Sequence, residues 1–226
     1  MKIDETLIIS GIFQKELKNR FRCVVKIDDI DEICYVSSSC RLTSFIDLYK
    51  KEVLLTPNVK SNDLQYTLFA VNEGTHSTIL NLAVANAVIF EQLHRRPFSF
   101  LGKRKSVHRE KLLEGYKADI FIEDTRTAIE IKAIISSEKQ AIFPAVHSER
   151  GLRQLDQIGL LLQKGYKVCY LFASLSSNVK SIVLDRATPF YSTFINRVNC
   201  GMLYYGCSLK IQNGEIRVAS ALEVIL

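Results

Sequence analysis

The first seventy residues alternate between short apolar runs and polar turns. The apolar runs are rich in β-branched residues and read TLIISGIF, FRCVVKI, EICYVS and EVLLT, with polar turns such as DDIDE between them. Runs of this length with turn signals between them are typical of β-strands. Several short strands with little helix predict a small barrel or sandwich.

The pattern changes near residue 75, where helical and strand-like segments begin to alternate. A switch of this kind predicts a central mixed sheet flanked by helices. We therefore expect two domains, residues 1–74 and residues 75–226. The expected elements of the second domain are a helix over 75–96, a hairpin over 116–133, a helix over 148–165, a buried strand over 166–175, a helix over 188–201 and a final hairpin around the Asn-Gly pair at 213–214.

The predicted hairpin over 116–133, YKADIFIEDTRTAIEIKA, places two acids in otherwise apolar strands. If EDTR forms the turn, Ile122 faces Thr127, and continuing the register outward brings Asp119 opposite Glu130. Two carboxylates facing each other across a sheet repel. Lys132 lies on the same face as Glu130. Either this lysine neutralises the acids or a metal ion does, and the sequence leaves both alternatives open.

Composition narrows the class of protein. The chain of 226 residues has no apolar run long enough to span a membrane, so we expect no membrane association. Its six cysteines form no C-x-x-C pair. We therefore expect reduced thiols and a cytoplasmic location.

The net charge of +6 comes entirely from the second part of the chain. Residues 94–111 contain seven basic residues and one acid. A concentrated basic patch attracts polyanions, although a solvated basic loop is the alternative. The candidate DNA-binding residues are Lys103, Arg104, Lys105 and Arg109, with Arg20 and Arg41 from the predicted barrel and Arg150 and Arg153 from the predicted 148–165 helix.

Asp119 followed by Glu130-x-Lys132 resembles the core of the PD-(D/E)xK nucleases. In such a core, two carboxylates hold a divalent cation through oxygen ligands. The cation activates water and stabilises the phosphate, and the lysine orients the water or stabilises charge. The candidate metal ligands are Asp119 and Glu130, and Glu91 is the candidate further acid from a preceding helix. A structural ion pair between Glu130 and Lys132 is the alternative.

Motifs along nearly the whole chain resemble the sugar fermentation stimulation protein A family. FPAVHSERGLRQL at 143–155 is similar to the family's F-P-D-A-V-[ST]-x-R-G-x-x-H-L, and NLAVANAVIFE at 81–91 is similar to its N-x-x-x-A-N-x-x-x-x-E helix. The hairpin, KNRFRCVV at 18–25 and NVKSNDLQYTL at 58–68 follow in the family's order. The resemblance implies an α+β fold: an N-terminal OB-like β-barrel, then a restriction-endonuclease-like domain. It also implies association with DNA and a role in regulating sugar metabolism.

This chain departs from the family pattern at several positions. VSSSCRL at 36–42 stands where the family has C-P-N-T-G-[RA]-M, Ala145 replaces the aspartate of F-P-D, and Gln154 replaces the histidine of H-L. Lys117 stands where the family has an arginine. Loss of the carboxylate at Ala145 puts catalysis in doubt, whereas DNA binding can survive it.

We expect a DNA-binding protein with a nuclease-type site formed by Glu91, Asp119, Glu130 and Lys132 that uses Mg²⁺ or Mn²⁺. The alternative is a non-catalytic DNA-binding regulator of sugar metabolism in which the carboxylates are structural. Single-stranded DNA and RNA remain alternatives to duplex DNA. The oligomeric state is open, with a homodimer among the alternatives.

Overall fold

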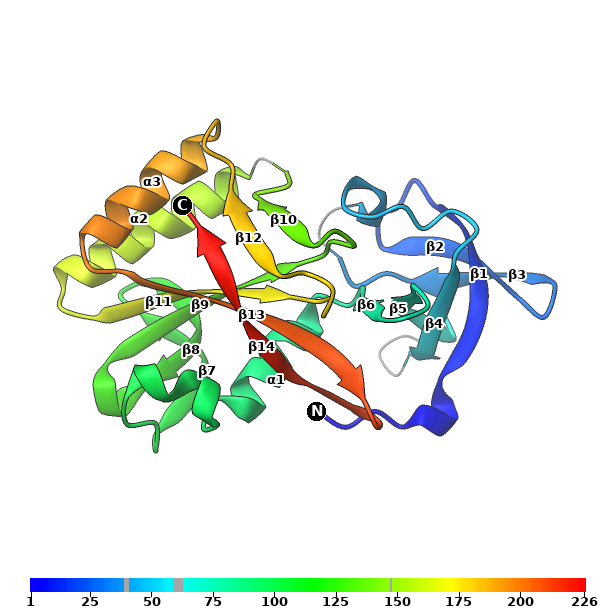
Figure 1. Ribbon diagram of the computed structural model, residues 1–226, viewed down its shortest axis with the longest axis horizontal. Helices are drawn as coiled ribbons and strands as arrows, with labels where there is room; N and C mark the ends of the chain where they lie inside the picture. Colours follow the sequence, from blue (N-terminus) through cyan, green and yellow to red (C-terminus); the bar gives the residue numbers. More distant parts are fainter. Residues whose placement is uncertain (39–40, 59–62, 147) are drawn as a thin grey trace.

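The computed structural model describes residues 1–38, 41–58, 63–146 and 148–226, and it contains two β-sheets (Figure 1). The first sheet has the strand order β3-β2-β1-β4-β5-β6. Its strands are β1 (Ile9–Glu16), β2 (Arg22–Ile27), β3 (Ile30–Tyr35), β4 (Glu52–Pro57), β5 (Tyr66–Asn72) and β6 (Ser77–Ile79).

Strands β1 to β5 close into a barrel. The closure comes from a pairing of β3 with β5, in which Tyr35 faces Thr67. Inward-facing residues such as Phe13, Val25 and Leu55 are buried in its centre. The expectation of an OB-like barrel is confirmed.

The second sheet has eight strands in the order β10-β12-β14-β13-β11-β9-β8-β7. It contains parallel pairs, such as β9 with β11, and antiparallel pairs, such as β13 with β14. The expected α+β fold with a mixed sheet is therefore confirmed. Its strands are β7 (Val107–Leu113), β8 (Tyr116–Ile122), β9 (Thr127–Ile134), β10 (Gln140–Phe143), β11 (Lys167–Ser174), β12 (Ser181–Leu184), β13 (Leu203–Gln212) and β14 (Glu215–Ile225).

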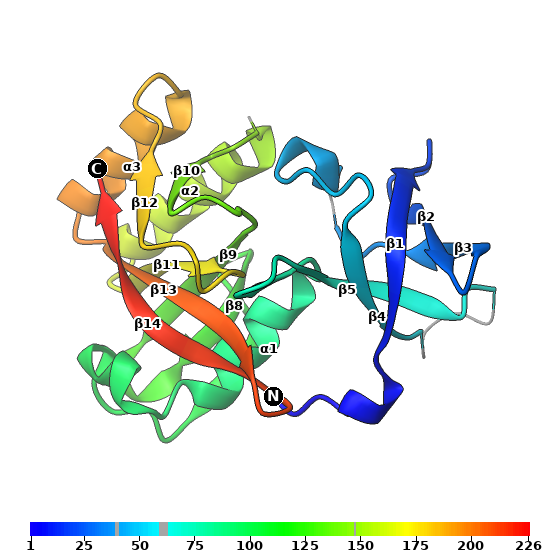
Figure 2. The same ribbon diagram turned by 45° about the vertical axis from the view of Figure 1, so that its right-hand side comes forward.

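Helices cover both faces of the second sheet (Figures 1 and 2). Helices α2 (Glu149–Gln163) and α3 (Pro189–Asn199) pack on one face, and α1 (Ala83–Gln92) packs on the other. Helix α2 begins where the Ser148 side chain accepts a hydrogen bond from the Gly151 amide, 3.2 Å away. It buries Leu155, Ile158 and Leu161 on one face because these positions recur at helical spacing.

The barrel and the second sheet share one hydrophobic core. Barrel residues, α1 and the face of the second sheet that carries Ile129 and Ile131 belong to a single buried cluster. Strand β6, beyond the predicted boundary at residue 74, pairs with β5 in the first sheet. The division of the chain into domains 1–74 and 75–226 stays a prediction.

The predicted helix over 75–96 is wrong at both ends. Residues 77–79 form β6, and only Ala83–Gln92 is α-helical. The Ile79 amide donates to the carbonyl of Leu175 at 2.9 Å, so a contact with a distant part of the chain outweighs the local helical pattern. A 3-10 helix over Arg96–Leu101 then follows, with Pro97 in its first turn.

The basic segment over 94–111 contains the start of β7, a strand that the sequence pattern did not predict. Strand β7 lies at the edge of the second sheet and pairs with β8. Exposed charges along an edge strand discourage pairing with another chain. The basic residues at the end of this segment therefore lie on an edge strand, where their charge can also serve to prevent pairing with another chain.

The start of the chain is joined to the last hairpin. The Ile3 amide donates to the carbonyl of Gly214 at 2.7 Å, in the Asn-Gly turn that joins β13 to β14 as predicted. The Met1 amine lies 2.8 Å from the carboxylate of Glu91 on α1. Figure 2 shows the N-terminus beside this turn.

No described helix is both long and apolar enough to cross a bilayer. Cys23, Cys34, Cys169 and Cys207 are buried free thiols, and Cys200 is exposed. Cys40 lies outside the described residues, as does part of the 58–68 segment.

Candidate functional site

The β8–β9 hairpin has the predicted register. Ile122 faces Thr127, Phe121 faces Ala128 and Ile120 faces Ile129. Beyond Ile120 the side chain of Asp119 takes over a main-chain role, because its Oδ2 accepts a hydrogen bond from the Ile131 amide at 2.7 Å. The regular pairing of the two strands thus ends at Asp119. Its carboxylate gives the Ile131 amide the acceptor that a backbone carbonyl would otherwise supply.

Asp119 is positioned from a second side by α1. The Asn86 side-chain amide donates to Asp119 Oδ1 at 2.9 Å. Burial raises the pKa of Asp119 to about 6, and the negative charge of Glu130 adds to the effect. The two hydrogen bonds and Lys132 oppose the rise without cancelling it. The two acids are therefore close enough to repel each other, as the sequence predicted.

Glu130 is 3% exposed and is surrounded by donors. Its Oε1 accepts from Lys132 Nζ at 2.6 Å and from the Gln154 side-chain amide at 2.8 Å. Its Oε2 accepts from the hydroxyl of Tyr116. Burial and the nearby Glu130 carboxylate raise the pKa of Tyr116, so this hydroxyl remains a donor.

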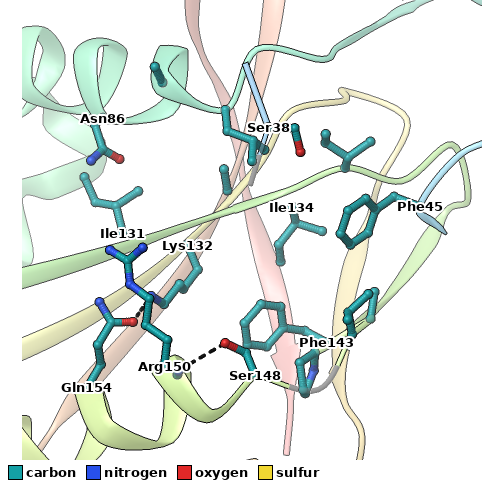
Figure 3. Close-up of a pocket in the computed structure, with 18 of the residues that line it drawn as sticks. Ser38, Phe45, Asn86, Ile131, Lys132, Ile134, Phe143, Ser148, Arg150 and Gln154 are labelled. Atoms are coloured by element: carbon teal, nitrogen blue, oxygen red, sulfur yellow. Dashed lines mark hydrogen bonds between the residues drawn. The ribbon is translucent and has the colours of Figure 1, made fainter. Parts of the chain in front are cut away.

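Lys132 also donates to Gln154 Oε1 at 2.6 Å, which links β9 to α2 (Figure 3). In one alternative posed by the sequence this lysine neutralises the acids, and in the other a metal ion does. The structure places an ion pair between Lys132 and Glu130. The pKa of Asp119 stays raised, mainly by burial and then by the charge of Glu130, although Lys132 opposes the rise.

A cavity of about 660 Å³ lies against this cluster, between the barrel and the second sheet. Asn86, Lys132 and Gln154 line it, and each of them bonds to one of the two acids. The acids themselves sit behind these three side chains. Figure 3 shows Arg150, Lys132 and Gln154 on one side of the cavity, with Phe45 of the barrel on the other.

Glu91, the predicted further acid, makes a different contact. Its carboxylate pairs with the Met1 amine, and it does not line the cavity. On α1, the residue that reaches the site is Asn86, one turn and a half before Glu91.

Arg150 is the predicted DNA-binding residue that lines the cavity. Arg153 lies exposed on the same helix. On the barrel, the Arg20 guanidinium lies 4.9 Å from the centroid of the Phe21 ring, and Arg41 donates to the carbonyl of Leu17 at 3.3 Å.

Among the other basic candidates, Lys103, Arg104 and Lys105 lie near the turn of the β8–β9 hairpin, whereas Arg109 on β7 pairs with Ile120, next to Asp119. Lys103 pairs with Asp124 at 3.2 Å, and the same aspartate accepts from the Lys105 amide. Arg104 donates to the Gly102 carbonyl, and Arg109 lies over the ring of Phe90 at 5.2 Å. Asp124 belongs to the turn between β8 and β9, whereas the cavity is lined by the opposite end of β9, residues 131–135.

Sequence reasoning missed four residues of the cluster. Asn86 lies in the 81–91 motif, which gave a signal for it, and Gln154 was noted only as a replacement. Tyr116 and Tyr170 gave no signal, because their roles depend on pairing across strands: Tyr170 on β11 stands beside Glu130 on β9.

The acids available for a metal ion are few. Among the described residues, no group of three or more histidine, cysteine, aspartate or glutamate side chains is placed to hold a metal. Ala145, where the family motif has an aspartate, lines the cavity without supplying a ligand. A cation here would have at most Asp119 and Glu130 as acidic ligands from the described chain.

Comparisons with known proteins agree with the fold and the motifs. A family model described as the sugar fermentation stimulation protein RE domain (SfsA) matches residues 83–215. A sugar fermentation stimulation protein homolog of Ruminiclostridium cellulolyticum is 25% identical over 230 residues, with 96% of each chain covered. One from Caldanaerobacter subterraneus is 23% identical over 224 residues, with 97% of each covered.

A solved structure has the same overall fold. The Pyrococcus furiosus SfsA in complex with Ca²⁺ superposes with a TM-score of 0.83 at 20% sequence identity, and the match covers 100% of both chains. At this identity the likeness establishes the shared fold.

Proposed function

The chain belongs to the sugar fermentation stimulation protein (SfsA) family, and from this premise we propose that it binds DNA and hydrolyses phosphodiester bonds with a divalent cation at Asp119 and Glu130. Lys132 is the third residue of the proposed site. DNA is the proposed partner, and the cytoplasm, where the thiols stay reduced, is the proposed location.

The observation that carries this proposal is the close placing of Asp119 and Glu130, which are bonded to Asn86, Lys132 and Gln154 at the wall of a cavity. A carboxylate pair kept close together at a cost in repulsion is typical of functional sites. The cost is visible here because burial and Glu130 raise the pKa of Asp119 to about 6. A divalent cation would remove that repulsion.

The residues present fit a weakly held, hydrated divalent cation. Carboxylate oxygens are the ligands that Mg²⁺ and Mn²⁺ prefer, and Mg²⁺ commonly keeps several waters and only one or two carboxylates. The Ca²⁺ complex of the Pyrococcus furiosus SfsA supports divalent cation binding in this fold. The cation supplies Lewis-acid chemistry, lowering the pKa of water and stabilising the charge on the phosphate.

The chain's own residues hold and orient the reacting groups. Asn86 and the Ile131 amide fix Asp119, and Tyr116 fixes Glu130 from the side away from Lys132. Lys132 and Gln154 both donate hydrogen bonds to Glu130 Oε1, and both line the cavity. We propose that they donate to a phosphate oxygen instead when substrate enters. Arg150 at the cavity wall binds the neighbouring phosphate.

The test is hydrolysis of plasmid and oligonucleotide DNA in Mg²⁺ or Mn²⁺ by wild-type protein and by Glu130→Gln. The matched control is Glu91→Gln, which removes an acid that pairs with the Met1 amine. We expect Glu130→Gln to lower the rate by about 100-fold or more, since it removes a ligand of the reacting centre. Binding in chelator should be retained by both variants.

Two results would contradict the proposal in different ways. Binding without hydrolysis in either metal would leave a non-catalytic DNA-binding regulator. Equal loss of hydrolysis in Glu91→Gln and Glu130→Gln would show that the activity does not depend on the proposed cluster.

A further inference from the structure

The cavity beside the acids has two chemically different sides. Lys132, Arg150 and Gln154 form a polar side next to Asp119 and Glu130. The other side is aromatic and apolar, and the barrel contributes Phe21, Tyr35 and Phe45 to it. In Figure 3, Phe45 and Phe143 lie on the side of the cavity opposite Gln154.

The aromatic side includes one ring held by packing, Phe143, and one that is partly exposed, Phe21. The ring of Phe143 makes edge contacts with Phe172 and Phe190, each with centroids 5.2 Å apart. Phe21 remains 38% exposed, although the Arg20 guanidinium lies over its ring. Aromatic rings that stay partly open suit a flat ligand that stacks on them.

An independent observation at the polar side also indicates a ligand. Tyr170 is one of the residues that line the cavity, and its hydroxyl is fully buried with no hydrogen-bond partner in the described part of the chain. A buried hydroxyl without a partner is costly. Burial, with Glu130 and Asp119 nearby, raises the pKa of Tyr170, so the hydroxyl keeps its proton and can donate to a ligand oxygen.

The size of the cavity limits what can enter it. A volume of about 660 Å³ is that of a small-molecule pocket, which accepts a nucleotide and excludes stacked, paired duplex. Enzymes that act on nucleotides in enclosed sites take single strands or bases turned out of the stack. A nucleotide has the same two-sided chemistry as the cavity: a flat aromatic base and an anionic phosphate.

We propose that the cavity binds an unpaired nucleotide of a single-stranded nucleic acid, with the base stacked against Phe21, Tyr35 and Phe45 and its phosphate at Lys132 and Arg150. The hydroxyl of Tyr170 donates to an oxygen of this nucleotide. The barrel thus selects single strands for the acids of the second sheet. This proposal rests on the proposed function and names the substrate class of the same site.

The test is fluorescence anisotropy in chelator, which separates binding from hydrolysis. The probes are a labelled single strand of about 12 nucleotides, a length within the site sizes of OB-type binders, and the same sequence as a blunt duplex. The variants are Phe21→Ala and Phe45→Ala. Phe21 is partly exposed, so its truncation should leave folding intact even if that of Phe45 does not.

The matched control is Tyr49→Ala. Tyr49 is a barrel aromatic residue that is 61% exposed and does not line the cavity. We expect the single strand to bind about tenfold or more tightly than the duplex, and Phe21→Ala to weaken binding to the single strand by about tenfold. Tyr49→Ala should change affinity by no more than about twofold.

Two outcomes overturn the inference and are distinguishable. If the duplex binds as tightly as the single strand and Phe21→Ala matches Tyr49→Ala, the cavity is not the nucleotide site, while DNA binding by the protein stands. If neither probe binds at low salt, the proposed function fails together with the inference.

Discussion

Asp119→Asn should destabilise the folded protein at acidic pH but not at neutral pH. Burial and the Glu130 charge raise the pKa of Asp119 from an ordinary value of 3.8 to about 6. The folded protein therefore binds this proton more tightly than the unfolded chain. The resulting stabilisation is fully present below about pH 3.8 and is lost as the pH rises through about 6.

The magnitude follows from the size of the pKa change. A pKa raised by roughly two units corresponds to about 3 kcal/mol in the free energy of unfolding. Because Asp119 is partly exposed, we expect most of this value rather than all of it. Asparagine has one carbonyl oxygen, so either Asn86 or the Ile131 amide loses its acceptor, at a cost of about 1–3 kcal/mol that does not depend on pH. The variant should therefore be less stable than wild type in acid and equal or more stable at neutral pH.

The measurement is urea unfolding of both proteins in chelator, at several values from about pH 4 to about pH 7. The difference between the two free energies of unfolding should change by about 2–3 kcal/mol across this range in favour of the variant. The control is Asp124→Asn. Backbone donation from Ser106 lowers the pKa of Asp124, so its stabilising contribution is lost as the pH falls. A difference for Asp119→Asn that stays constant with pH would refute the reasoning.

The same variant tests the proposed cation. In wild type, millimolar Mn²⁺ or Ca²⁺ should raise the Tm, because a ligand that binds only the folded state stabilises it by about 2.7 kcal/mol at 100 times its Kd. Asp119→Asn should lose this rise. A wild-type Tm that ignores both cations would exclude the metal site and leave the ion pair as the role of Lys132.

Three further predictions concern other parts of the molecule. Lys132→Met should lower the free energy of unfolding by roughly 3 kcal/mol in urea titrations, because Glu130 is buried and loses its cation. Gly206→Ala should cost on the order of 2 kcal/mol, seen as a lower Tm, because a Cβ there would lie 2.9 Å from the carbonyl oxygen of Leu222. Affinity for DNA should fall steeply with salt, and Arg153→Ala should reduce the slope of log affinity against log salt by about 1.

Two of these predictions have a contrasting case. Lys164→Met removes a cation whose partner Glu114 is more exposed, so it should lower the free energy of unfolding much less than Lys132→Met does. Equal costs for the two lysine variants would contradict the importance of burial at Glu130. An affinity for DNA that does not change with salt would contradict phosphate contacts altogether.

The parts of the fold that depend on local pattern were predictable from the sequence. The turn at EDTR and the alternating apolar residues correctly gave the register of Ile120, Phe121 and Ile122 against the next strand. The barrel strands, α2 and the Asn-Gly hairpin follow from equally local signals. The same signals predicted that Asp119 and Glu130 would lie close together.

The parts that depend on distant contacts were not predictable. The pattern of residues 77–79 favours a helix, but Ile79 bonds to Leu175, nearly a hundred residues away in sequence. Glu91 has the spacing of a catalytic acid, yet its partner is the Met1 amine. The place of Tyr170 beside Glu130 follows from the order of strands in the sheet, which no local pattern specifies.

The contact between residues 1–3 and the β13–β14 turn has a consequence for the order of folding during synthesis. The Met1 amine donates to the carbonyl of Ile216, a contact between residues 215 positions apart. The ribosome makes the barrel strands first, but the segment that leads into β1 finds its partners only after the last hairpin has emerged. Contacts of such long range slow folding, so the nascent barrel waits with its first residues undocked. A chaperone or protease that meets the growing chain would find this leading segment accessible until the β13–β14 hairpin has emerged.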